Sequence, residues 1–325
     1  MRIVTYRHRG SVGTGLIAGN DVVDLTRALA ALYRRRGRPR ASALAAFVAP
    51  PGDVVRLLEG ETAALDDARA ALEEIGPRLA AEPESCRREG LLFGTVEVAL
   101  GPPVPNPGKI ACMWVNYLAH GKEVAVDTPK TDPVFFSKFP SVAIAPGEPI
   151  VLPRRSRQVD YEAELAVVIG RTAKDVPEER ALETVAGYTI LNDVSARDFN
   201  LDRVVGAVAP YIIQKTFDTF APMGPALVTA DEVPDPQRLP IRLWIDGELL
   251  QDGNTERMVF KIPQIISYLS GVVTLRPGDV ISTGTPPGSG HWRKPPRYLR
   301  AGDRVRIEVG NLGVLENPVV DDSSG

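Results

Sequence analysis

The chain has 325 residues, which is enough for one large domain or for a catalytic domain with a smaller companion. Its formal net charge of −3 argues against a nucleic-acid-binding surface, and no apolar run approaches the roughly 20 residues of a membrane-spanning helix. The N-terminus lacks the apolar core of a secretory signal, so we expect a cytoplasmic protein. Two cysteines and three histidines argue against a disulfide framework and a multi-histidine metal site.

Short strands followed by helices are predicted for the first 100 residues. Residues 1–25 have the pattern of strands joined by turns, and Gly19-Asn20-Asp21 is a hairpin signal. Residues 26–37 and 61–76 have apolar side chains at helical spacing, and each stretch ends at a glycine. These patterns predict a smaller α/β N-terminal region over residues 1–105.

Residues 106–325 are dominated by short β-rich runs. The segment 101–109 carries so many prolines and glycines that it is interpreted as a linker. Two helical stretches, 177–187 and 260–271, lie among the later runs. Many strands with few helices favour a β-dominated sandwich or barrel-like domain over a doubly wound α/β sheet. The predicted strands lie in KIACMWV (109–115), PIVLP (149–153), EAELAVVIG (162–170), VAGYTILND (185–193), GPALVTA (224–230), IRLWIDGEL (241–249), DVISTG (279–284) and DRVRIEVG (303–310).

Two glutamates lead into the most apolar of these strands. Glu162 and Glu164 are two residues apart, so in a strand they project from the same face. The run that follows looks buried on both faces, and two crowded carboxylates at its edge repel each other and lose hydration. A divalent cation would relieve both problems, because hard cations prefer carboxylate oxygens. The alternative is an exposed edge strand with solvated glutamates.

A third acid follows another apolar strand. Asp193 stands where the run VAGYTIL turns, so it can reach a shared site without breaking the strand ladder. Arg197 and Asp198 come next and would place a fixed cation near the metal. The alternative is a helix N-cap formed by Asp193 with Ser195, together with a local Arg197–Asp198 pair.

With these motifs in view, the chain resembles the fumarylacetoacetate hydrolase superfamily over nearly all of 109–318. The resemblance implies a mixed α+β, β-dominated fold, with a twisted β-sandwich or roll as the catalytic domain. It also implies a Mg²⁺ or Mn²⁺ cofactor (Ca²⁺ as an alternative ion), a small keto-acid substrate and a homodimer. Glu162, Glu164 and Asp193 fall on the family's metal ligands. The motifs that carry the resemblance are NYLAHGKE (116–123), FFSK (135–138), DYEAELAVVIG (160–170), GYTILNDVSARD (187–198), KTFDTFAPMGP (215–225), LRPGDVISTGTPPGSG (275–290) and YLRAGD (298–303).

The resemblance also implies three catalytic residues. His120 and Glu123 are three residues apart, so on one helical turn they share a face, and a carboxylate-oriented histidine can activate water. The alternative is a solvated pair on a lid. Lys215 matches the family lysine that contacts the substrate and would stabilise an enolate or oxyanion, the alternative being a surface lysine.

Four further residues are predicted to contact the substrate. Arg197 would bind a substrate carboxylate as a planar fork, and Asn200 stands where some hydrolytic relatives have glutamine. Thr285 would offer its hydroxyl to the same carboxylate or oxyanion, unless it only shapes a turn. Lys138 would border the site or play a structural role. The basic loop 291–298 would close over the pocket or remain a plain surface loop.

The activity expected first is hydrolysis of a C–C bond in a β-diketo or acylpyruvate-type acid. The cation would polarise the dicarbonyl, so that an enolate becomes a tolerable leaving group. The alternatives are an oxaloacetate-type decarboxylase and an isomerase or hydratase of a 2-keto acid. A more remote alternative is a relative that has lost catalysis and acts as a binding protein.

Overall fold

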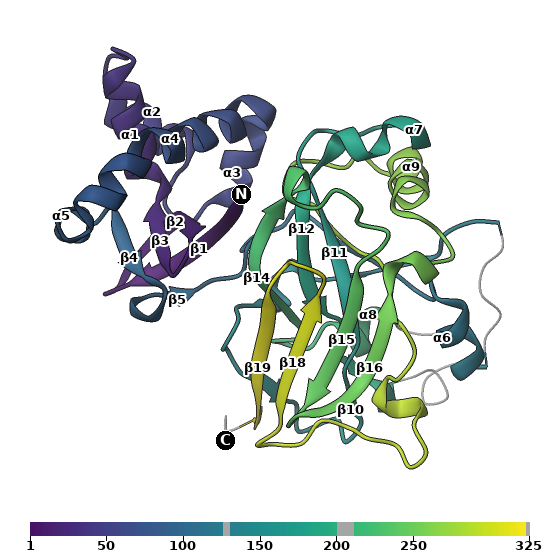
Figure 1. The fold of residues 1–325 in the computed structure, drawn as a ribbon. Coiled ribbons are helices and arrows are strands. Elements are labelled where there is room, and N and C mark those ends of the chain that lie inside the picture. Colours follow the sequence, from purple (N-terminus) through teal and green to yellow (C-terminus); the bar gives the residue numbers. More distant parts are fainter. Residues whose placement is uncertain (126–130, 200–210, 323–325) are drawn as a thin grey trace.

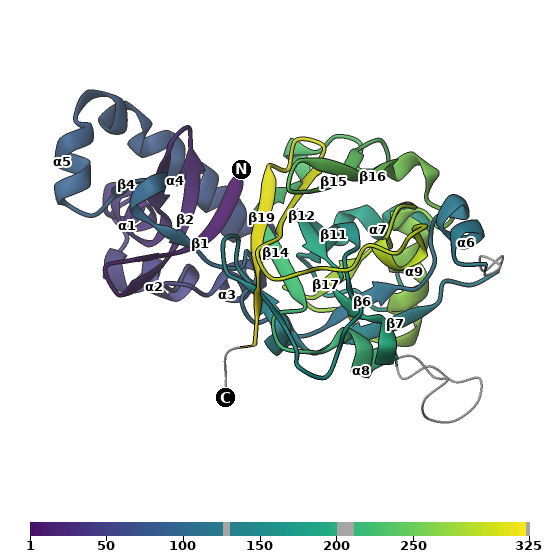
Figure 2. The same cartoon turned by 90° about the horizontal axis from the view of Figure 1, so that it is seen from below.

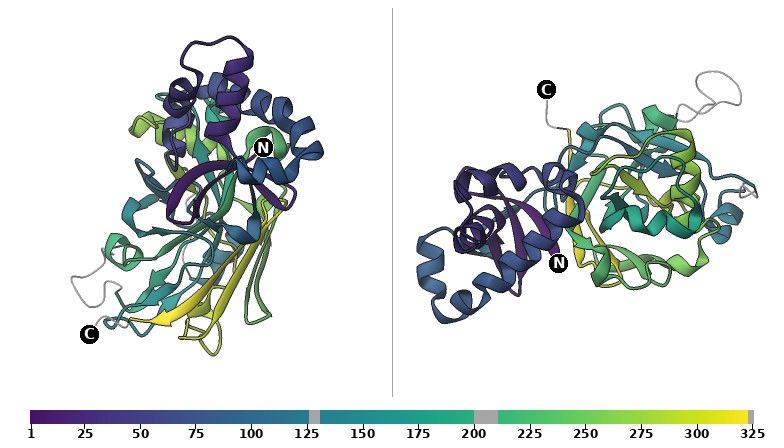
Figure 3. Two further views of the ribbon diagram at one scale, coloured as in Figure 1. Left: turned by 90° about the vertical axis from the view of Figure 1, so that its left-hand side faces the viewer. Right: turned by 90° about the horizontal axis from the view of Figure 1, so that it is seen from above.

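The computed structural model describes residues 1–125, 131–199 and 211–322 of a mixed α+β, strand-rich chain. A helical lobe, purple to blue in Figure 1, lies beside a larger β-rich body. Figures 2 and 3 show the same two parts from below, from the side and from above. The predicted fold class is confirmed. Among the described residues, no helix has the length and apolar character needed to cross a membrane.

The N-terminal region contains the predicted hairpin. β2 and β3 are joined by Gly19 and Asn20, with Ala18 paired to Asp21 and Gly19 at a φ of 62°. Helix α4 does not end at Gly76 as predicted, because Pro77 removes one backbone donor without breaking the helix. The strands are β1 (Arg2–His8), β2 (Ser11–Ala18), β3 (Asp21–Asp24), β4 (Leu92–Gly94) and β5 (Ala99–Leu100). The helices are α1 (Leu25–Arg35), α2 (Ala41–Val48), α3 (Val54–Glu59), α4 (Glu61–Ala81) and α5 (Pro83–Arg88).

One long sheet runs through both parts of the chain. Its order is β4-β3-β2-β1-β14-β12-β11-β17-β6-β7, so the N-terminal strands continue the sheet of the larger β-rich body. The junction is the antiparallel pair β1–β14, in which Ile3 lies opposite Leu227. Segment 101–109 contains no helix or strand, as predicted for a linker. The catalytic strands of this sheet are β6 (Ile110–Met113), β7 (Phe135–Lys138), β11 (Ala163–Ile169), β12 (Val185–Asn192), β14 (Ala221–Thr229) and β17 (Val280–Ser282), and β8 (Ala143–Ile144) pairs with β14.

A second sheet packs over the long one and encloses the main core. Along β11, Leu165 and Val167 face this core, whereas Ala166 and Val168 join the apolar cluster that extends to the N-terminal helices. Both faces of β11 are therefore buried, as its apolar run predicts. The second sheet has the order β16 (Glu248–Asn254), β15 (Pro240–Ile245), β18 (Arg304–Val309), β19 (Val314–Asp321) and β9 (Ile150–Leu152). A small pair is formed by β10 (Val159–Asp160) and β13 (Ser195–Ala196).

Short helices cover the catalytic body. The predicted helix 260–271 is α9 (Ile262–Val272). The prediction for 177–187 was too long, because α7 (Glu178–Ala181) passes into a 3₁₀ turn and β12 takes over at Val185. The other two helices, α6 (Leu118–Glu123) and α8 (Tyr211–Lys215), carry predicted site residues.

Candidate metal centre and active site

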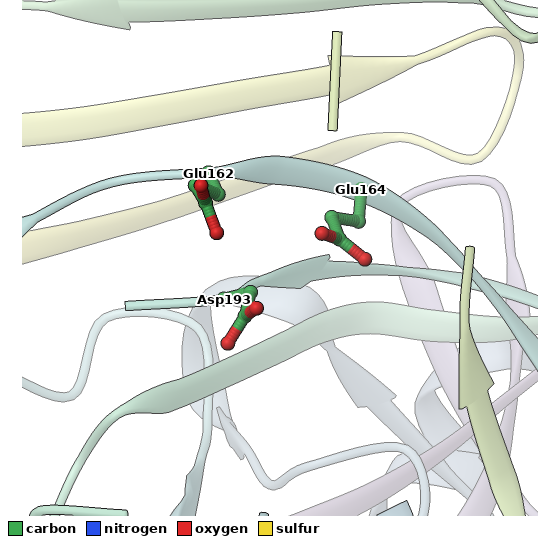
Figure 4. A group of neighbouring side chains, drawn as sticks. All are labelled: Glu162, Glu164 and Asp193. Atoms are coloured by element: carbon green, nitrogen blue, oxygen red, sulfur yellow. The ribbon is translucent and has the colours of Figure 1, made fainter. Parts of the chain in front are cut away.

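Three buried carboxylates meet at one end of β11. Glu162, Glu164 and Asp193 each offer an oxygen, and these oxygens all lie within 4.8 Å of one another. Figure 4 shows the two glutamates on one strand segment, with Asp193 approaching from the neighbouring chain segment after β12. The strand alternation placed Glu162 and Glu164 on one face, and the alternative of an exposed edge strand is wrong, since all three side chains are buried.

Of the three carboxylates, Glu164 is the one with the fewest compensating charges beside it. Ser282 Oγ donates to its Oε2 at 2.5 Å, and the Gly284 amide donates to the same oxygen at 2.8 Å. Among the described residues, no partner bonds to Oε1, which leaves that oxygen for an ion. Burial, together with Asp193 and Glu162, raises the pKa of Glu164 to about 8.

Glu162 has the opposite electrostatic environment. Lys215 Nζ donates to its Oε2 at 2.6 Å, and an Arg197 terminal nitrogen donates to its Oε1. Burial opposes ionisation, but Arg197, Lys215 and His120 outweigh it and lower the pKa of Glu162. Glu162 is therefore a charged carboxylate at neutral pH.

Asp193 is held by two ammonium groups. Lys215 Nζ lies 2.5 Å from its Oδ2, and Lys138 Nζ lies 2.5 Å from its Oδ1. Lys138 also donates to the Val194 carbonyl at 3.0 Å, and its side chain is fully buried. Lys138 therefore holds the Asp193 carboxylate in place, as the alternative of a structural role would have it, and its predicted substrate contact stays a prediction.

Lys215 bridges two of the three carboxylates. Asp193 and Glu162 outweigh the effect of burial and raise its pKa, so this ammonium stays charged at neutral pH. Its Nζ also lies 4.9 Å from the centre of the Phe136 ring. The alternative of a surface lysine is therefore wrong. Lys215 lies beside Glu162 and Asp193, where its ammonium could contact a negatively charged group of a bound small molecule.

His120 and Glu123 form the predicted pair on α6. His120 Nδ1 lies 2.9 Å from Glu123 Oε2, and the other carboxylate oxygen accepts the Gly288 amide at 2.9 Å. His120 Nε2 lies 4.0 Å from Glu162 Oε1, and only 4% of the residue is exposed. The solvated-pair alternative is wrong, because one imidazole nitrogen is oriented by Glu123 while the other faces the carboxylates.

Arg197 is paired inside the site and not with its neighbour. Its Nε donates to Asp160 Oδ2 at 2.9 Å, and a terminal nitrogen contacts Glu162. Asp198 instead accepts from Ser156 Oγ at 2.6 Å, so a local Arg197–Asp198 pair is excluded. Asp193 caps no helix either, since its carboxylate bonds to the two lysines.

Two of the predicted substrate contacts lie elsewhere or have other partners. The Thr285 hydroxyl donates to the Ala163 carbonyl at 3.0 Å and accepts from Gln251 Nε2 at 2.8 Å. This hydroxyl thus joins the strand to its loop, and a substrate contact stays a prediction. Asn200 falls outside the described residues.

Asp160 is the site residue that sequence reasoning missed. It accepts the Arg197 guanidinium and the backbone amides of Gly290 and His291, and it is fully buried. The sequence did contain a pattern that could have identified it, because Asp160, Glu162 and Glu164 occupy every second position and would share one face of a strand. The contribution of Ser282 to the site had no comparable signal, since it depends on the pairing of β17 with β11.

The family model for the C-terminal part of fumarylacetoacetate hydrolase matches residues 109–320. The chain belongs to the fumarylacetoacetate hydrolase family. Human mitochondrial oxaloacetate tautomerase FAHD2A is 45% identical over 270 residues, which are 83% of this chain and 80% of that protein.

Two solved structures with similar folds each cover 99% of the chain. Maleylpyruvate hydrolase from Sphingobium sp. SYK-6, in complex with manganese(II) and pyruvate, matches with a TM-score of 0.72 and 32% identity over 99% of both chains. The 5-carboxymethyl-2-hydroxymuconate delta-isomerase from Mycobacterium smegmatis matches with a TM-score of 0.69 and 30% identity, over 99% of this chain and 100% of that one.

The donor set fits the family's divalent cation. Three buried carboxylates, one of them with an oxygen that no described residue bonds to, are the hard ligands that Mg²⁺ and Mn²⁺ prefer. The raised pKa of Glu164 reflects its burial first and then the negative charges of Asp193 and Glu162 beside it. Glu162, Glu164 and Asp193 would hold the ion.

Metal binding should depend on pH below about 8. Glu164 is mostly protonated at pH 7, since its pKa is raised to about 8, and an ion requires the carboxylate. Each bound Mn²⁺ should then release roughly one proton at pH 7, and affinity should rise by up to about tenfold per pH unit between pH 6 and 8. Calorimetry at pH 6, 7 and 8, in buffers of different ionisation enthalpy, measures both quantities. An affinity that is flat over this range would contradict the assignment.

Proposed function

We propose that this enzyme moves a proton at the carbon next to the keto group of a 2-keto acid, and that its reaction is keto–enol tautomerisation of an oxaloacetate-type substrate. The observation that carries the proposal is the placement of His120. Its Nδ1 is held by Glu123 and its Nε2 lies 4.0 Å from a predicted metal ligand. A keto acid seated at that ligand would bring its C3 hydrogen toward the imidazole. The 45% identity to human oxaloacetate tautomerase supports this choice.

Each residue then has a separate task. The divalent cation, when bound, would draw electron density from the keto oxygen and acidify the C3 proton. His120 would take that proton, while Glu123 keeps the imidazole oriented. The Lys215 ammonium would stabilise the negative charge that develops on the keto oxygen. Return of the proton from His120 to that oxygen would complete the enol.

C–C bond hydrolysis is the second candidate, and the same histidine favours it. An imidazole held by a carboxylate can deprotonate water as well as carbon. The 32% identical maleylpyruvate hydrolase covers 99% of both chains, which supports this reading. In this reaction His120 would activate water for attack on the distal carbonyl of an acylpyruvate-type acid.

Three reactions of two substrates test the choice. With Mg²⁺ or Mn²⁺ present, oxaloacetate tautomerisation, oxaloacetate decarboxylation and acetylpyruvate cleavage are measured on the same preparation. We expect tautomerisation to be the fastest by at least about tenfold. Faster acetylpyruvate cleavage would favour the hydrolase, and a bound metal without any turnover would favour a binding protein.

We also propose that the enzyme is a cytoplasmic homodimer whose contacts come mainly from the β-rich part. Phe139 and Ile213, each 51% exposed, lie on the β7–α8 side of that part and are suited to such a contact. Light scattering on the full chain should give about twice 35.1 kDa. A mass near that of one chain at micromolar concentration would contradict the dimer.

A further inference from the structure

The loop 284–291 supplies the backbone frame of the site. Its amides donate to three different carboxylates: Gly284 to Glu164, Gly288 to Glu123 and Gly290 to Asp160, at 2.7–2.9 Å. One short segment therefore positions Glu164, which is a predicted metal ligand, Glu123, which pairs with His120, and Asp160, which pairs with Arg197. Any side chain that leaves this loop has a defined position relative to the metal ligands.

Two glycines fix the path of the loop. A Cβ on Gly290 would lie 1.8 Å from the Arg297 carbonyl oxygen and 2.7 Å from Asp160 Oδ1. A Cβ on Gly288 would lie 2.2 Å from the Leu250 carbonyl oxygen, at a φ of 106°. The loop backbone therefore packs closely against neighbouring backbone. This packing fixes the position of the backbone of the next residue, His291.

His291 is held at its backbone and at one ring nitrogen. Its amide donates to Asp160 Oδ2 at 3.2 Å, the oxygen that also accepts Arg197 Nε. Its Nδ1 lies 2.8 Å from the Tyr298 hydroxyl, and its ring packs edge-on against Trp292 with centroids 4.6 Å apart. Among the described residues, Nε2 has no hydrogen-bond partner.

The ring is poised to act as a neutral donor. Burial and then Arg197 lower the pKa of His291, so the imidazole is uncharged at neutral pH. Burial and then Asp160 raise the pKa of Tyr298, so its hydroxyl keeps its proton. If this hydroxyl donates to Nδ1, the imidazole hydrogen must lie on Nε2.

The charges around the metal ligands explain why a second substrate carboxylate would require a neutral hydrogen-bond donor. An ion requires Glu164 in its charged form, and three ligand carboxylates then face two ammonium groups, Lys138 and Lys215, while Arg197 is balanced by Asp160. With Glu164 charged and without the ion, the net charge of these five groups is −1. A bound divalent cation changes it to +1, and one substrate carboxylate then neutralises the site. A second carboxylate on the substrate would find no free cation among these groups and would require neutral donors.

We propose that His291, through Nε2–H, recognises a carboxylate at the end of the substrate remote from the metal, and that Tyr298 sets its tautomer. The site would therefore select dicarboxylic keto acids over keto acids with a single carboxylate. The inference deepens the proposed function and rests on its keto-acid substrate. His291 is a specificity residue in this scheme, and Tyr298 is a positioning residue.

Binding of two acids with the same keto-acid head tests the proposal without turnover. Calorimetry on the Mn²⁺-loaded protein compares pyruvate with 2-ketoglutarate, which adds a remote carboxylate. His291→Ala should weaken 2-ketoglutarate binding by about tenfold or more, the loss expected for one hydrogen bond to a charged group, and change pyruvate binding by less than about twofold. Tyr298→Phe should cause a smaller loss confined to the same acid. His8→Ala, at a histidine on β1, is the matched control and should change neither.

Equal losses for both acids, or no loss for either, in the His291 variant would overturn the proposal. Selective loss without tautomerase activity in the wild type would support it while the proposed reaction fails. If the wild type binds neither acid, the keto-acid function itself is overturned, together with the inference built on it.

Discussion

Replacing Glu164 by alanine should abolish metal binding and all turnover. The ion would lose one of three carboxylates, and with it the only one whose second oxygen has no partner in the described part of the chain. Loss of residues that merely orient ligands costs about 10–100-fold in metal affinity, so loss of a ligand should exceed a hundredfold. Calorimetric titration with Mg²⁺ and Mn²⁺ measures the effect.

Glu164→Gln is the matched control for folding. An amide oxygen can still accept from Ser282 Oγ and the Gly284 amide, whereas the charge is lost. Because burial keeps Glu164 mostly protonated at pH 7, the metal-free variant should melt near the wild-type temperature. Wild-type Mn²⁺ affinity in either variant would remove Glu164 from the ligand set.

Replacing His120 by alanine should abolish tautomerisation and C–C hydrolysis while metal binding persists. Both reactions require a base, and loss of a positioned base typically costs about 10²–10⁴-fold in rate. The metal ligands do not depend on the imidazole, which lies 4.0 Å from the nearest of them, so Mn²⁺ affinity should stay within about twofold. Oxaloacetate decarboxylation forms its enolate without such a base and should decline far less.

Rates for the three reactions, measured side by side in wild type and variant, separate the possibilities. Oxalate inhibition in both proteins reports whether the ion and its ligand sphere are intact. A variant that tautomerises oxaloacetate and cleaves acetylpyruvate within tenfold of wild type would show that His120 is not the base. The pair with Glu123 would then only order the α6 segment.

Local patterns predicted the parts of the site that lie within single strands and turns. The two-residue period placed Glu162 and Glu164 together, and the spacing of His120 and Glu123 on one helical turn predicted their contact. For Asp193, the local sequence was also compatible with a helix N-cap. The prediction that it is a metal ligand came from the resemblance to a known family.

Contacts between distant strands could not be predicted in this way. The choice of Asp160 over Asp198 as the partner of Arg197 depends on how β10 meets β13. Lys138 had no signal for complete burial, because lysine is almost never buried without a partner and its partner, Asp193, is 55 residues away. The end of α4 was misjudged for a related reason, since the helix runs through Gly76 and Pro77 to Ala81, and the partly buried Leu79 beyond them still packs against the apolar core.

The pairing of β1 with β14 means that the N-terminal region covers an edge of β14 that would otherwise be exposed. β14 is a nine-residue strand near the middle of the long sheet, and β1 occupies its outer edge at Leu227 and Val228. Removing residues 1–105 would leave that stretch of backbone amides and carbonyls without partners, on a strand lined with apolar side chains. Such an edge is a template for pairing with other chains and hence for aggregation. The N-terminal region therefore limits how the β-rich body can be truncated, independently of any part in catalysis.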